Sequence, residues 1–411
     1  MLLAVSVGFA ADYLFNLALG KTLPAHEYGD YKVAYAFALI AGTLVLLGGD
    51  RVAPRILSAP LSRGDNRLAG AFFKFYLLII IILSTVLILA TTSTSSLNFG
   101  SAQFHYHHPI ALMSFVIPLI AIGSLLSRVL QSAKLIAYSN LPWRIVFPLV
   151  KTALVILLAV MAVRIHLWHV IAISATVVSL IVIWQWYKVR QYALLSFEQA
   201  GETLERRQML RLSVPMMLAM LITLALNHLD LFMLELLGDE KEVGYFAAAA
   251  TTAHLIPVAQ ATIAVLFLPL IAPAMESGNQ AARAMFLRGQ KFITIAVVVL
   301  TLFILLAGKW LLSLFGDGFQ QAQQVLVYLA FGYALWALTA FCSTWLQYSS
   351  MGLRAVLTGC TALIINVSLN LWLIPLYGMH GAAVATLVSM GIAAGILGII
   401  YFRYVYLDLM S

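Results

Sequence analysis

The feature that most constrains this chain is a succession of apolar runs, each about 20 residues long, separated by short polar loops. The runs do not alternate between polar and apolar residues, so they indicate helices and not strands. Only 10% of the residues are charged, whereas a soluble domain would carry about 25%. Because lipid offers the backbone no hydrogen-bond partners, such runs predict transmembrane helices. We therefore expect an all-α polytopic membrane protein.

Run length and helix-breaking residues predict about twelve transmembrane helices. The first run begins at residue 2, has no basic segment before it and continues through Asp12, so it is interpreted as a membrane helix and not a signal peptide. Its abrupt start would fit a longer natural N-terminus. The predicted spans lie near 2–20, 31–49, 70–91, 109–130, 142–163, 167–187, 212–237, 244–272, 292–314, 322–346, 355–376 and 381–402.

The distribution of basic residues predicts the orientation of these spans. If the N-terminus is cytoplasmic, most of the Lys and Arg residues fall in the inner loops. The outer side then holds Lys21, Lys32, Arg164, Lys241 and Lys309. Because cytoplasmic loops carry an excess of cations, this asymmetry predicts a bacterial inner-membrane protein with both termini in the cytoplasm. The net charge of +8 is then a topology signal, and no nucleic-acid partner is expected.

The longest hydrophilic stretch, near 188–211, divides the chain into two halves. We predict an N-terminal six-helix lobe at 1–190, a cytoplasmic linker at 191–211 and a C-terminal six-helix lobe at 212–411. An internal repeat supports a duplication, because the first outer loop of each half ends in Glu-x-Gly and an aromatic residue, at 27–31 and at 242–245. Copies with an even number of spans share one orientation, so the symmetry axis that relates the two lobes is expected along the membrane normal.

Several passages resemble one family over nearly the whole chain. They are LPAHEYGDY at 23–31, LLGGDRVAPR at 46–55, SVPMMLAMLITLALNHLDLFMLELLG at 213–238, EVGYFAAAA at 242–250 and NVSLNLWLIPLYGMHGAAVATLVS at 366–389. In this order they are similar to the Wzx-type oligosaccharide flippases of the multidrug/oligosaccharidyl-lipid/polysaccharide (MOP) exporter superfamily. Drug exporters of that superfamily generally lack the pattern YG-x-x-GAA-x-AT, which stands here at 377–386.

The resemblance implies a flippase and not an enzyme. Two six-helix lobes around a central cavity would move a lipid-linked oligosaccharide, usually on undecaprenyl pyrophosphate, from the cytoplasmic to the periplasmic leaflet by alternating access. The product would serve cell-surface polysaccharide biosynthesis, such as the O-antigen of lipopolysaccharide. A polysaccharide polymerase, a chain-length regulator and membrane lipids would be partners. No cofactor is expected apart from a coupling proton or sodium ion. A cation-coupled drug exporter is the main alternative. A membrane polymerase or ligase is a third, which the short outer loops disfavour.

Translocation requires a polar path for the pyrophosphate, so basic residues within or beside spans are the first candidates. A charge in hydrocarbon is costly unless it faces a cavity. Lys151 lies mid-span, one heptad after Arg144 and on the same face of a regular helix. We predict a basic ladder of these two residues for the pyrophosphate, so that Lys151→Ala abolishes surface polysaccharide at normal protein levels. The alternatives are snorkelling of Arg144 and an ion pair of Lys151 with a carboxylate such as Asp12.

Other polar residues are weaker candidates for the substrate path. Arg51 and Arg55 follow the second span and could receive substrate at the cavity mouth, although anchoring at the membrane surface would also explain them. Snorkelling would equally explain basic residues near inner helix ends. The remaining substrate-binding candidates are Lys74, Arg128, Gln131 and Gln260.

Acidic residues inside spans are candidates for proton or sodium coupling. Asp12 has Asn16 one turn later, and Asp230 has Asn227 one turn earlier, at roughly equivalent positions of the two halves. The alternative is a structural pair with a buried cation.

Two further groups of polar residues are assigned no chemistry. Asn366 and Asn370 share one helix face, where hydrogen bonding between helices is expected. The histidines 105, 107 and 108 have no acidic or cysteine neighbour in the sequence, so no metal site is predicted. No catalytic motif is found.

Overall fold

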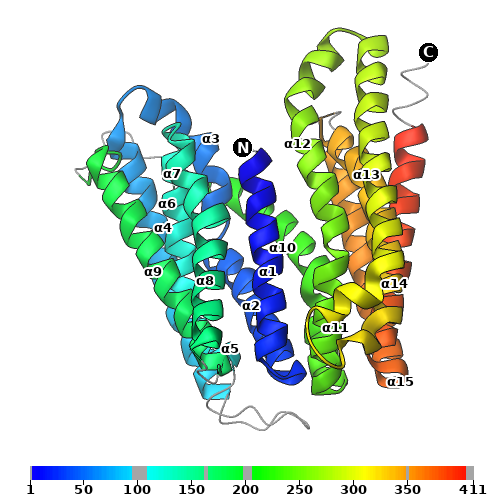
Figure 1. Cartoon of the computed structure of the whole chain (residues 1–411). Coiled ribbons are helices and arrows are strands. Elements are labelled where there is room, and N and C mark those ends of the chain that lie inside the picture. Colours follow the sequence, from blue (N-terminus) through cyan, green and yellow to red (C-terminus); the bar gives the residue numbers. More distant parts are fainter. Residues whose placement is uncertain (1, 95–108, 162–164, 198–205, 349–350, 404–411) are drawn as a thin grey trace. The chain divides into compact units, whose positions relative to one another are not determined.

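The computed structural model describes residues 2–94, 109–161, 165–197, 206–348 and 351–403, and all regular secondary structure in these residues is helical (Figure 1). The chain forms two compact units. Unit 1 comprises residues 3–18 and 30–224, and unit 2 comprises residues 19–29 and 225–411, together with residue 2. The units divide inside a long helix, between residues 224 and 225. The predicted lobes and the linker at 191–211 stay predictions. Part of that stretch, 198–205, lies outside the described residues.

Unit 1 is built from α1 to α9 and the first part of α10. Within it α6 packs against α3 and α9, and α8 packs against α9. The helices are α1 (Leu2–Thr22), α2 (Ala25–Val45), α3 (Gly49–Ser62), α4 (Asn66–Thr94), α5 (Pro109–Ser114), α6 (Ile117–Ser132), α7 (Ile136–Leu141), the π-helical turn η1 (Pro142–Val146), α8 (Phe147–Val160), α9 (Leu167–Gln191) and α10 (Arg206–Leu237).

Unit 2 contains the rest of α10 and the helices that follow, together with the α1–α2 turn. Here α14 packs against α15, α13 and α12, and α12 packs against α13. The helices are α11 (Glu240–Ala253), α12 (Leu255–Glu276), α13 (Asn279–Ser313), the 3-10 turn η2 (Phe319–Ala322), α14 (Gln323–Tyr348) and α15 (Gly352–Tyr401).

The described helices have the length and composition of membrane spans. Nine continuous helical segments are apolar and long enough to cross a bilayer, and α2 with α3, bent by 47°, forms a tenth candidate. The 50 residues of α15 suffice for two crossings, since one crossing takes about 20 residues. With α1 added, the structure is consistent with the twelve predicted spans. Large apolar side chains remain exposed, such as Leu306 at 88%, as expected for a surface that faces lipid.

Two sharp bends depend on glycine. Gly378 interrupts α15 with φ 54° and ψ −133°, and Glu242 of α11 accepts a hydrogen bond from the backbone N–H of Met379 at 2.9 Å. Gly48 separates α2 from α3 with φ 75°, and a Cβ there would overlap the carbonyl of Ser213. Both bends require a positive φ, which residues other than glycine rarely adopt.

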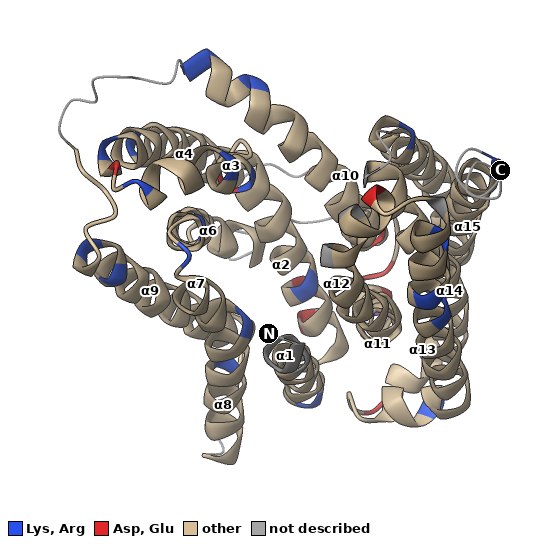
Figure 2. Cartoon of the chain, turned by 90° about the horizontal axis from the view of Figure 1, so that it is seen from above, with Lys and Arg blue, Asp and Glu red and all other residues tan. Residues whose placement is uncertain are grey.

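Charged side chains are sparse on the helices, and Figure 2 shows where the basic and acidic residues lie.

Candidate substrate pocket and polar clusters

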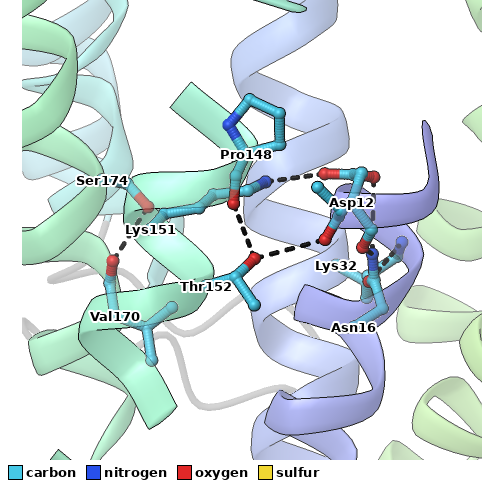
Figure 3. A network of polar contacts seen from close by, with 9 residues as sticks. Asp12, Asn16, Lys32, Pro148, Lys151, Thr152, Val170 and Ser174 are labelled. Carbon is cyan, nitrogen blue, oxygen red and sulfur yellow. Dashed lines mark hydrogen bonds and ion pairs between the residues drawn. The ribbon is translucent and has the colours of Figure 1, made fainter. Parts of the chain in front are cut away.

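A buried ion pair joins α1 to α8 in unit 1. The Nζ atom of Lys151 lies 2.7 Å from Oδ1 of Asp12 (Figure 3). The lysine side chain is 2% exposed and the aspartate side chain 45%, so the pair is accessible from its Asp12 side. The rings of Phe15 and Phe147 lie 4.0 and 4.8 Å from the ammonium group and cover it. Of the arrangements considered for Lys151, the pair with Asp12 is therefore the one present in this conformation.

Asn16 connects this pair to a second lysine. Its Nδ2 donates to the backbone carbonyl of Asp12 at 2.7 Å, and its Oδ1 accepts from Nζ of Lys32 at 3.1 Å. Lys32 belongs to α2, which begins at Ala25, so it lies inside a helix, as the predicted span 31–49 implied. The hydroxyl of Thr152 also bonds α8 to α1, by donating to the carbonyl of Ala11 at 3.2 Å. Asp12 thus has neighbours from α1, α2 and α8.

A second polar feature of unit 1 is a pocket of about 260 Å³ between α6, α7 and η1. Arg128 of α6 and Arg144 of η1 both line it, so two of the predicted substrate residues face one cavity. The other lining residues offer hydroxyl, amide and indole groups with few aliphatic side chains; they are Ile120, Ser124, Ser127, Ser139, Asn140 and Trp143. We call this cavity the arginine pocket. Its two guanidinium groups can donate paired hydrogen bonds to phosphate oxygens.

The charges around the arginine pocket are mixed. Arg128 donates to Oε1 of Gln131 at 2.6 Å, and the charges of Asp50, Arg51 and Arg144 all act on its guanidinium group. Arg51 forms an ion pair with Asp50, with Nε 3.2 Å from the carboxylate oxygen. Three arginines and one aspartate therefore leave the region positively charged, which favours an anionic ligand.

The π-helical turn η1 places Arg144 in the pocket. The N–H of Phe147 reaches back five residues to the carbonyl of Pro142, where an α-helix would reach back four. Such turns insert one residue and re-aim the side chains around them. Gly8 of α1 packs against the carbonyl of Arg144, so closely that a Cβ would overlap it. The predicted ladder assumed a regular helix between Arg144 and Lys151. In the structure Arg144 lines the arginine pocket, and Lys151 pairs with Asp12.

Gln185 of α9 does not line the arginine pocket but bonds to three residues that do. Its side chain is fully buried, its Oε1 accepts from the indole N–H of Trp143 at 3.1 Å, and its Nε2 donates to the hydroxyl of Ser127 at 2.8 Å. The same Nε2 lies 3.3 Å from the carbonyl of Ser139. One amide thereby joins α9 to three pocket-lining residues on α6, α7 and η1. Gln185 was not among the predicted site residues, although a glutamine inside an apolar run was a visible signal.

Gln185→Leu is expected to destabilise unit 1 by about 1–3 kcal/mol, because the substitution leaves buried donors and acceptors without partners. Thermal unfolding of the purified protein in detergent measures this change. Gln191→Leu at the end of the same helix is the matched control, since Gln191 is exposed and, among the described residues, its side chain accepts one hydrogen bond, from Lys188 at 2.8 Å. Equal stability of the two variants would contradict a structural role for Gln185.

Unit 2 contains a buried carboxylate with neutral partners. Oδ1 of Asp230 accepts from the side-chain amides of Asn370 at 2.6 Å and Asn366 at 3.0 Å, and Oδ2 accepts from the hydroxyl of Thr386 at 2.5 Å. Within the described residues no Lys or Arg pairs with Asp230, which is 4% exposed. Oδ1 of Asn370 is buried and has no hydrogen-bond partner in this part of the chain. Asn366 and Asn370 were expected to form hydrogen bonds between helices. In the structure both donate to Asp230 and so join α15 to α10.

The other predicted site residues have different surroundings. Arg55 and Lys74 are exposed, and Gln260 is buried in unit 2 on α12. Asn227 lies half-buried on α10, one turn before Asp230. The histidines at 105, 107 and 108 lie outside the described residues. Within the described residues, no group of three or more His, Cys, Asp or Glu side chains could hold a metal ion.

Solved structures with the same fold are transport proteins. An inward-facing multidrug resistance MATE family transporter of the MOP superfamily aligns with a TM-score of 0.79 and 15% identity, over 99% of this chain and 98% of the other. The lipid II flippase MurJ, in an inward closed conformation, aligns with a TM-score of 0.77 and 12% identity, over 99% of this chain and 88% of the other. An outward-facing MATE transporter aligns with a TM-score of 0.67 and 14% identity, over 100% and 95%. No curated protein sequence matches the chain.

These likenesses define the class: the chain is a multi-pass membrane protein with the fold of MOP-superfamily exporters and flippases, as the sequence resemblance implied. The family follows from the sequence itself. A family model described as "Polysaccharide biosynthesis protein" matches residues 1–275, which is more than half of the chain. The chain therefore belongs to the polysaccharide biosynthesis protein family.

Proposed function

We propose that this protein translocates a polyprenyl-pyrophosphate-linked oligosaccharide across the bacterial inner membrane by alternating access. The arginine pocket is the observation that carries the proposal. Two guanidinium groups line a cavity that also presents hydroxyl and amide groups. A pyrophosphate needs the first kind of group, and the sugar attached to it needs the second. Membership of the polysaccharide biosynthesis family supports the same substrate class.

The proposed translocation requires the protein to recognise and move the lipid-linked oligosaccharide, without forming a covalent bond. Arg128 and Arg144 hold the pyrophosphate, while Ser124 and Asn140 bond to the first sugar. The Asp12–Lys151 pair is a second position on the path, where an incoming phosphate competes with Asp12 for the lysine. The protein is not an enzyme, its termini are cytoplasmic, and a polymerase and chain-length regulator act on its product. In this proposal the lipid carrier is undecaprenyl pyrophosphate, and the oligosaccharide becomes part of the O-antigen.

A vesicle assay tests the substrate class directly. Full-length protein is reconstituted with an undecaprenyl-pyrophosphate-linked oligosaccharide, and a membrane-impermeant periodate pulse oxidises the outward-facing sugars. Protein-containing vesicles are expected to expose inner-leaflet sugar over time, whereas protein-free vesicles keep it protected. A cationic drug loaded into parallel vesicles tests the exporter alternative. Drug efflux without sugar exposure would contradict the flippase proposal.

We further propose that the Asp230 cluster couples transport to a proton or a sodium ion. A buried carboxylate without a cationic partner is costly, so its charge is neutralised by a bound proton or cation. Asp230, the hydroxyl of Thr386 and the unpartnered Oδ1 of Asn370 supply oxygen atoms for a cation within one cluster. Helices interrupted as α15 is at Gly378 commonly hold coupling ions in transporters.

Asp230→Asn is expected to remove this coupling, because the amide neither titrates nor neutralises a cation. Wild-type protein in vesicles should translocate faster when a sodium or proton gradient is imposed, and the variant should run at the same slow rate with and without the gradient. Thr223→Val, on the exposed side of α10, is the control and should retain the gradient response. A gradient response that survives in Asp230→Asn would contradict a coupling role for this carboxylate.

A further inference from the structure

A groove on unit 1 has no role in the proposed translocation path. It has a volume of about 560 Å³ and lies between α9 on one side and α7, η1 and α8 on the other. Its walls are apolar or aromatic throughout, and it shares no lining residue with the arginine pocket. The lining residues are Ala137, Tyr138, Leu141, Pro142, Val146, Val150, Val177, Leu180, Ile181 and Trp184. We call it the α7–α9 groove.

The groove opens on a surface of lipid-facing character. Leu180 is 60% exposed, Val146 43% and Leu141 42%, although all three are apolar. In a helix that crosses a bilayer, such exposed side chains contact acyl chains. A hydrocarbon chain is therefore the occupant that the groove fits in a membrane.

Lys188 lies at one end of the groove. The Nζ atom of Lys188 lies 5.1 Å from the ring centre of Tyr138 and 5.8 Å from that of Trp184, and both rings line the groove. Tyr187 supplies a third ring at 5.5 Å. The ammonium donates to Oε1 of Gln191 at 2.8 Å, and no carboxylate of the described residues pairs with it.

A cation beside tyrosine and tryptophan near the end of a span is typical of the headgroup level of a bilayer. The rings hold the lysine chain against the helix surface and keep its charge at the groove end. An apolar slot with an unpaired ammonium group at its end complements a ligand with one hydrocarbon chain and one negative charge. Phospholipids with an anionic headgroup have this chemistry.

We propose that the α7–α9 groove is a binding site for an anionic phospholipid. One acyl chain lies in the groove, and the phosphate contacts Lys188. The lipid would brace α7 and η1 from the side opposite the arginine pocket, because Leu141 and Pro142 face the groove while Trp143 and Arg144 face the pocket. This site does not depend on which cargo the protein carries.

Quenching of tryptophan fluorescence by brominated lipids tests the proposal. Full-length protein in detergent is titrated with phosphatidylglycerol or phosphatidylcholine carrying brominated acyl chains. The signal of Trp184 is obtained as the difference from Trp184→Phe. Wild-type protein is expected to reach half-maximal quenching at about fivefold less phosphatidylglycerol than phosphatidylcholine, which is the usual contribution of one lysine near anionic lipid.

Two variants and one competitor separate this site from general charge effects. Lys188→Gln should bring phosphatidylglycerol to the level of phosphatidylcholine, and Val150→Phe, which fills the groove, should weaken quenching by both lipids. Lys134→Gln, an exposed basic residue in the α6–α7 turn, should leave the fivefold preference unchanged. Equal quenching by both lipids in the wild type would overturn the proposal. So would loss of the preference in Lys134→Gln, or displacement of phosphatidylglycerol by smaller amounts of undecaprenyl phosphate.

Discussion

The double substitution Arg128→Ala and Arg144→Ala is expected to slow translocation of a pyrophosphate-linked oligosaccharide by at least about 100-fold. Each arginine contributes charge-assisted hydrogen bonds to the phosphates, and such bonds contribute about 1.5–3 kcal/mol. Losing both removes the two guanidinium groups from the arginine pocket. The initial rate at which sugar becomes accessible to periodate in reconstituted vesicles measures the effect.

Two further variants show whether the loss concerns phosphate recognition. Arg144→Lys keeps the charge but cannot donate paired bonds from one plane, so its rate should fall between those of the wild type and Arg144→Ala. Arg63→Ala removes an exposed cation at the end of α3, outside the pocket, and should retain the wild-type rate. If the double variant translocates at the wild-type rate, the arginine pocket does not hold the substrate.

The helical class of this protein could be predicted from sequence because it depends on run length and composition alone. Chains of about 20 apolar residues leave few alternatives in lipid. The turns and helix irregularities were harder to predict from the sequence. Nothing in the run 142–163 indicates that its first residues form a π-helical turn. The predicted break between the spans 355–376 and 381–402, in contrast, is present as the non-helical Gly378 inside α15. Local pattern does not reveal such π-helical turns, because packing against other helices, as with Gly8 on η1, helps to set them.

The candidate site residues were also only partly predictable from the sequence. Charged residues inside spans were visible as candidates, since each must have a partner or a cavity. Their partners were not predictable in general, because Lys151 and Asp12 are far apart in the chain and spacing carries no information about such contacts. The pair with Asp12 could be named as an alternative but not chosen over the ladder. Gln185 and Lys32 were missed as site residues. Neutral amides, and lysines near the end of a predicted span as Lys32 is, are common in membrane proteins and give a weak signal.

The ion pair of Asp12 and Lys151 yields the second large effect, because its two members are unequally buried. Asp12→Asn leaves a lysine that is 2% exposed without its counter-ion, and an unpaired charge of this kind costs about 3–5 kcal/mol. Lys151→Met leaves a carboxylate that is 45% exposed and still has Lys32 nearby, so its cost is smaller. Asp12→Asn should therefore lower the thermal stability of the detergent-purified protein far more than Lys151→Met does.

The double variant Asp12→Asn with Lys151→Met distinguishes a structural pair from a substrate-binding lysine. Removing both charges leaves neither member of the pair without its counter-ion, so the stability should return close to that of the wild type. If Lys151 also receives the phosphate, the double variant should be stable and yet translocate at a small fraction of the wild-type rate in vesicles. Wild-type translocation by a stable double variant would show that the pair joins α1 to α8 and does nothing for the cargo. The arginine pocket would then account for phosphate recognition without Lys151, since no residue of the pair lines it.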